Sequence, residues 1–175
     1  MGLVVLGLVA GGIGYYAAIL HIILHSLVKS GFFFQYNQLY RVFQSKSILY
    51  MGNYFKYHPA GALVLLLGFF SAAAMPPSGM FISEFLIFRS LFEARYFLLL
   101  IAVLVLLTLI IWSFGKNIFK IVFTPLQEFD EQQVPVSYSW ECLSQFILMA
   151  IAIYLGFNPP EAFADLIRES VSLLP

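Results

Sequence analysis

Charged residues and cysteine are both scarce in this sequence. Of its 175 residues 10% are charged and 61% are hydrophobic, and the mean hydropathy is +0.90; an ordinary soluble domain has roughly 25% charged residues. The 9 basic and 9 acidic side chains cancel, so the charge gives no reason to expect nucleic acid as a partner. The single cysteine, Cys142, excludes an internal disulfide and any iron-sulfur or haem motif built from paired cysteines. We therefore expect no redox centre and no cofactor in this chain.

Motifs of soluble enzymes are missing as well. The sequence has no nucleotide-binding glycine motif, no zinc-ligand spacing that would indicate a metal site, and no Ser-His-Asp arrangement. Its first residues lack the basic segment and the cleavage site of a secretory signal, and they read as if the chain began inside a helix. What is present is a series of apolar runs, several of them close to the about 20 residues that cross a bilayer as a helix.

These runs predict an all-α integral membrane protein with about six transmembrane helices or half-helices. We expect residues 1–157 to form one transmembrane helical bundle and residues 158–175 to form an amphipathic C-terminal tail. The polar stretch 35–58 is rich in tyrosine and basic residues, so it is expected to be a loop at the membrane interface. The apolar runs are 2–12, 15–34, 59–74, 80–91, 96–118 and 140–157.

Three titratable side chains interrupt the second apolar run. His21, His25 and Lys29 are four residues apart, so they form one polar stripe along a helix. If the helix begins near Tyr15, the stripe straddles the middle of the bilayer. A charge there costs roughly 2.5 to 3.5 kcal/mol, and such residues usually face a bundle interior or a water-filled path. The stripe indicates an ion or proton route; the alternative is that the histidines cap a neighbouring helix and Lys29 reaches the interface.

A backbone break follows the run 59–74. Pro76, Pro77 and Gly79 cannot continue a regular helix. Within a membrane, the polar groups that a break leaves unpaired must be buried in protein or line a hydrated cavity, and in transporters such breaks often mark the transport site. Glu84 follows about one turn later, near the positive end of the resumed helix. It is a second candidate for the ion route, unless it caps the helix at the interface.

The stripe and the break together resemble a known family. The spacing His21-x3-His25-x3-Lys29, followed by 30–34 (SGFFF), and the stretch 72–87 (AAAMPPSGMFISEFLI) are similar to the C-terminal half of the antiporter-like proton-pumping subunits. These subunits occur in respiratory complex I (NADH-quinone oxidoreductase), in formate hydrogenlyase and energy-converting hydrogenases, and in Mrp-type sodium/proton antiporters. The resemblance covers nearly the whole chain, and Pro-Pro-x-Gly-x-x-x-x-Glu-Phe is its most specific part.

The resemblance implies a role for each candidate residue. Subunits of this family contain two similar helical bundles, each part of a proton pathway, joined by a central polar axis. Lys29 matches the central lysine of the second bundle, and His21 and His25 match the histidines that accompany it. Glu84 matches the acidic or lysine position on the broken helix near the exit. We therefore expect a proton relay from Lys29 through the two histidines and water to Glu84.

The family's first bundle, with its buried glutamate and partner lysine, has no counterpart in this sequence. We expect a fragment or split half of a proton-translocating subunit, in an oxidoreductase complex but without a redox centre of its own. Another membrane subunit would supply the missing N-terminal bundle, and the complex would lie in the lipid bilayer of a prokaryotic cytoplasmic membrane. Two alternatives stay open: a sodium/proton antiporter subunit of the Mrp type, and a structural fragment that does not transport.

Overall fold

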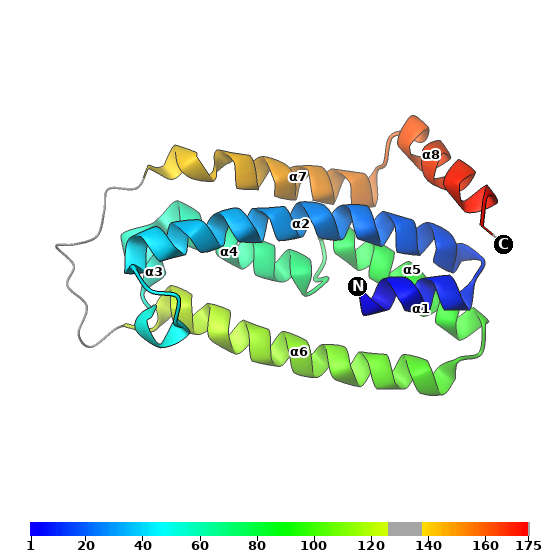
Figure 1. Ribbon diagram of the computed structural model, residues 1–175, viewed down its shortest axis with the longest axis horizontal. Helices are drawn as coiled ribbons and strands as arrows, with labels where there is room; N and C mark the ends of the chain where they lie inside the picture. The colour runs from blue at the N-terminus through cyan, green and yellow to red at the C-terminus, as the bar shows by residue number, and fades with distance from the viewer. Residues whose placement is uncertain (126–137, 175) are drawn as a thin grey trace.

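The computed structural model describes residues 1–125 and 138–174. Within these ranges every regular element is a helix and no strand is present. The long helix α2 (Ile13–Phe43) runs the length of the bundle, α7 (Leu143–Phe157) packs against it, and α6 (Phe97–Phe123) lies along the opposite side of the bundle (Figure 1). The prediction of an all-α membrane protein is confirmed.

Three described segments are long and apolar enough to cross a membrane. They are α2, α6 and the segment Ser139–Phe157, in which the 3-10 helix η3 (Ser139–Cys142) leads into α7. The remaining apolar helices are shorter than the about 20 residues of a full span. They are α1 (Gly2–Ala10), α4 (Pro59–Ala72) and α5 (Gly79–Glu93).

Helices α4 and α5 form the two halves of one broken helix. They follow one another along α2 (Figure 1), and the predicted Pro-Pro break lies between them. The hydroxyl of Ser78 serves both ends, because it donates to the carbonyl of Ser71 at 3.2 Å and accepts from the backbone N–H of Met80 at 3.1 Å. Part of the backbone hydrogen bonding lost at the break is recovered in this way.

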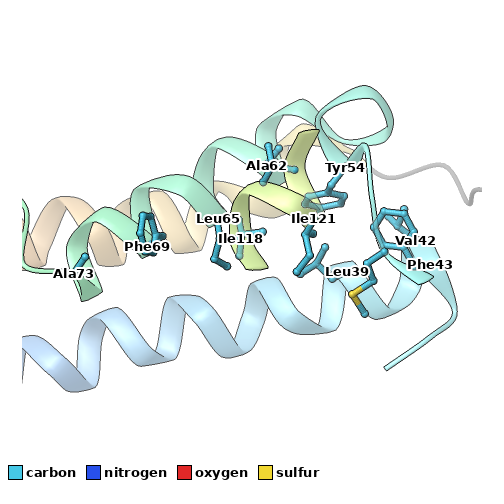
Figure 2. Close-up of a cluster of buried hydrophobic side chains, with 12 residues drawn as sticks. Leu39, Val42, Phe43, Tyr54, Ala62, Leu65, Phe69, Ala73, Ile118 and Ile121 are labelled. Carbon is cyan, nitrogen blue, oxygen red and sulfur yellow. The ribbon is translucent and has the colours of Figure 1, made fainter. Parts of the chain in front are cut away.

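The prediction that the polar stretch 35–58 is a loop is wrong for its first nine residues. Helix α2 continues to Phe43 because Leu39, Val42 and Phe43 pack with α4 and α6 in the buried cluster of Figure 2. These side chains recur at helical spacing, and tertiary contacts therefore outweigh the polar residues between them. The rest of the stretch holds η1 (Ile48–Tyr50) and α3 (Tyr54–Tyr57).

A second buried cluster joins α2, α5, α7 and the C-terminal helix α8 (Glu161–Ser172). Helix α8 is amphipathic: Ile167 is buried in this cluster, whereas Asp165 and Arg168 form an exposed ion pair. Helices α5 and α7 approach so closely that a Cβ atom on Gly79 would overlap the carbonyl oxygen of Ala152. Glycine is therefore required at the start of α5, and this contact fixes the orientation of α5 in the bundle.

Candidate functional site

The polar stripe of α2 turns around the helix. Residues four apart differ by about 40° in direction around a helix. His21 is 2% exposed, His25 is half-buried and Lys29 is exposed. The rings of His21 and His25 are stacked, with their centroids 5.8 Å apart. The stripe therefore leads from His21, buried against α5, to Lys29 on the exposed surface of the bundle. Lys29 lies near the middle of α2.

Ser83 of α5 holds the ring of His21. Its Oγ is 3.0 Å from Nδ1 of His21 and donates to the carbonyl of Met80 at 2.9 Å. Because a hydroxyl has one proton to donate, Nδ1 of His21 is the donor in the first contact, and Nε2 of the neutral ring remains an acceptor. Sequence reasoning missed Ser83. The available signal was its position on the same face of α5 as the buried Ile87.

Glu84 is the sixth residue of α5 and is 8% exposed. Among the described residues its carboxylate has no hydrogen-bond or ion-pair partner. It does not cap the helix, because Ser78 does so. The charge of a helix N-terminus acts mainly within the first turn, so Glu84 lies beyond its strongest effect. An unpaired, buried carboxyl group is costly to ionise without water, and this points to a hydrated surrounding.

Three cavities are lined by the predicted residues. A cavity of about 560 Å³ is lined by Lys29 and His25 among mostly apolar side chains. A second, of about 530 Å³, is lined by His25, His21 and Glu84. A third, of about 210 Å³, is lined by Glu84 and Thr108. His25 thus lines both the first and the second cavity, and Glu84 lines both the second and the third.

The residues of the helix break contribute through the backbone rather than through their own side chains. Pro76 and Pro77 are exposed and do not line any of the three cavities. Gly79 is buried against α7. The part of the break that does line the third cavity is Ala73 and Ala74, next to Glu84. The prolines end α4, and the segment between the two helices supplies a wall of the cavity.

The apolar spans and the buried His21 and Glu84 define an integral membrane protein with titratable side chains along a helical bundle. Residues 1–110 match the NADH:quinone oxidoreductase/Mrp antiporter transmembrane family. The matched range includes the stripe on α2, the helix break and Glu84. The chain therefore belongs to this family, as its sequence motifs predict.

Two curated relatives extend the comparison. The hydrogenase-4 component F homolog of Methylacidiphilum infernorum (isolate V4) is 30% identical over 149 residues, which are 84% of this chain and 30% of the relative. NADH-ubiquinone oxidoreductase chain 4 of Acanthamoeba castellanii is 32% identical over 124 residues, which are 69% of this chain and 25% of the relative. The chain thus spans less than a third of the length of either relative.

Proposed function

We propose that this chain is part of a proton-translocating membrane subunit of an NADH-quinone oxidoreductase or hydrogenase-type complex. The observation that carries the proposal is the series of three cavities along which Lys29, His25, His21 and Glu84 follow one another. The family and the names of the two relatives support the same class of complex. The chain itself would carry protons, and the redox chemistry would belong to other subunits.

Lys29 is the first group of the proposed route. It is exposed near the middle of a helix long enough to cross the membrane. A lysine at that depth is tolerated when it faces water, a cavity or a partner. The cavity beside it, of about 560 Å³, has ample room for water, since one water needs roughly 10 to 15 Å³ of such space. Water in this cavity would connect the amine of Lys29 to the ring of His25.

The two histidines are suited to pass a proton toward Glu84. Histidine is the side chain whose ordinary pKa lies closest to neutral pH, so it gains and loses a proton readily. With Nδ1 of His21 donating to Ser83, a proton arriving at Nε2 gives a cationic ring whose contact with α5 is unchanged. The cavity that His21 shares with Glu84 would then carry the proton to the carboxylate through water.

Partners and location follow from the same proposal. Because the chain spans 30% of the hydrogenase relative and 25% of the other, we propose that further membrane helices, including an N-terminal bundle, complete the pathway. The exposed position of Lys29 is a natural place for such a neighbour. A prokaryotic cytoplasmic membrane stays a prediction.

The test is proton flux in membrane vesicles that contain the complex to which this chain belongs. A pH-sensitive dye reports acidification after the electron donor is added. We expect Lys29→Ala and Glu84→Ala each to abolish acidification, while mass spectrometry shows the same subunit composition as the wild type. Lys116→Ala is the matched control, because Lys116 is an exposed lysine of α6 that lines none of the three cavities. Its flux should be unchanged.

The same vesicles separate the alternatives. Unchanged acidification in Lys29→Ala or Glu84→Ala would refute the role of that residue, and a tolerated Lys29→Met would favour a structural fragment. A sodium/proton antiporter of the Mrp type would instead show proton movement that depends on added sodium and is accompanied by sodium moving the opposite way. Proton translocation alone predicts equal flux with and without sodium.

A further inference from the structure

A second group of buried polar side chains lies outside the three cavities, toward the C-terminal end of α2. Gln35 of α2, His58 at the start of α4 and Gln145 of α7 are 0%, 2% and 2% exposed. Each has one fully buried polar atom without a hydrogen-bond partner among the described residues: Oε1 of Gln35, Nε2 of His58 and Oε1 of Gln145. Buried polar atoms are nearly always paired with protein or with ordered water.

Gln35 and His58 are neighbours across the α2–α4 contact. A Cβ atom added to Gly61, in the first turn of α4, would lie 2.6 Å from Nδ1 of His58 and 2.8 Å from Nε2 of Gln35. Both side chains therefore surround the same point of α4. The absence of a side chain at Gly61 gives them the room to do so.

Gln145 reaches the same region from α7. Helices α2 and α7 run antiparallel (Figure 1), and Sγ of Cys142 lies 3.3 Å from Oε1 of Gln38. Because the two helices run antiparallel, the residue one turn before Gln38 on α2 lies opposite the residue one turn after Cys142 on α7. Gln35 and Gln145 hold these positions, and both are buried. The three helices thus bring these three buried side chains to one part of the interior.

The three atoms have the donor and acceptor pattern that one water molecule satisfies. Nδ1 of His58 accepts the backbone N–H of Gly61 at 2.7 Å, so the neutral ring carries its proton on Nε2 and is a donor there. Nε2 of Gln35 donates to the hydroxyl of Tyr54 at 2.7 Å, which leaves Oε1 as an acceptor. Oε1 of Gln145 is a second acceptor. A water molecule accepts one hydrogen bond and donates two in this setting.

We propose that α2, α4 and α7 enclose a bound water that accepts from Nε2 of His58 and donates to Oε1 of Gln35 and of Gln145. This water pins the three helices together at the end of the bundle remote from Glu84. It also holds His58 in the Nε2-protonated form. The site shares no residue with the proton route above, so it stands or falls independently of the proposed function.

Solid-state NMR of the full chain in phospholipid bilayers tests the site without any substitution. Histidine is labelled with ¹⁵N, and the signals of His58 are assigned by their loss in His58→Gln. We expect magnetisation from water protons to reach Nε2 of His58. Absence of this transfer overturns the proposal, and so does a direct contact between the Nε2 proton of His58 and the side chain of either glutamine.

Substitution of one acceptor then tests the geometry. Gln145→Leu should reduce the transfer from water to Nε2 of His58 at least two-fold, because the water loses a partner. Gln38→Leu is the matched control: Gln38 is also a buried glutamine of α2, but its Oε1 is already paired with Cys142. Unchanged transfer in Gln145→Leu, or an equal loss in Gln38→Leu, contradicts the assignment. Should Gln145→Leu fail to fold, the measurement on the unsubstituted chain decides.

Discussion

The contact between His21 and Ser83 is expected to be a measurable part of the stability of the bundle. Ser83→Ala removes the hydroxyl 3.0 Å from Nδ1 of His21, and it leaves this nitrogen of a side chain that is 2% exposed without its partner. Leaving a buried donor unpaired costs about 1–3 kcal/mol, whereas the loss of one oxygen atom changes the packing little. We therefore expect the free energy of unfolding to fall by about 1–3 kcal/mol. Proton flux should fall as well, because the ring of His21 is no longer held between α2 and α5.

The assay is unfolding of the full chain in mixed detergent micelles, followed by circular dichroism. Ser26→Ala is the matched control, because Ser26 is exposed and, among the described residues, its hydroxyl bonds only to the carbonyl of Ile22 on its own helix. Its effect should lie within about 0.5 kcal/mol. A double-mutant cycle with His21→Phe should give a coupling of about 0.5–3 kcal/mol. An effect of Ser83→Ala no larger than that of Ser26→Ala, or simple additivity in the cycle, would refute the reasoning.

Two further predictions concern packing and pH. Gly79→Ala should destabilise the chain by about 1–3 kcal/mol, because its added methyl group meets the backbone of α7. Gly2→Ala, whose added methyl group meets open space, should have little effect in the same unfolding assay. Equal effects of the two substitutions would contradict the close contact. Burial raises the pKa of Tyr54, so the folded chain keeps this proton at a pH where the unfolded chain has lost it, and stability should decline as the pH rises above about 10. An alkaline titration of the unfolding free energy checks this, and Tyr54→Phe should flatten the decline; an equally steep decline in the variant would show that other groups cause it.

The sequence allowed the class of protein and the main candidates to be predicted, because both depend on local patterns. Apolar runs have the length of a membrane span, and a titratable side chain within one of them stands out. The end of α2 could not be predicted in this way. Gln35 and Gln38 read as the start of a polar loop, yet both are buried by partners far along the chain, Tyr54 and Cys142 respectively.

Ser83 escaped sequence analysis for a related reason. A serine in an apolar helix commonly bonds to a carbonyl of its own helix, as Ser26 and Ser90 do. Ser83 makes such a bond to Met80, and it also meets His21, which is 62 residues away. Only the packing of α5 against α2 reveals the second contact. The candidate residues and the order of the relay could therefore be predicted from the sequence, but the groups that hold these side chains required the fold.

The break between α4 and α5 allows the two helices to pack in different clusters while both line the cavities. Helix α4 packs in the cluster of Figure 2, and α5 packs against α7, so an unbroken helix would have to satisfy both orientations at once. Ala72, the last residue of α4, and Met80, in the first turn of α5, both line the cavity beside Lys29 and the cavity beside His21. The backbone carbonyls of Phe69, Phe70 and Ser71 are paired near the break, but among the described residues that of Ala72 has no backbone partner. The break therefore leaves the carbonyl of a residue that lines both cavities without a backbone partner, and bound water would satisfy it.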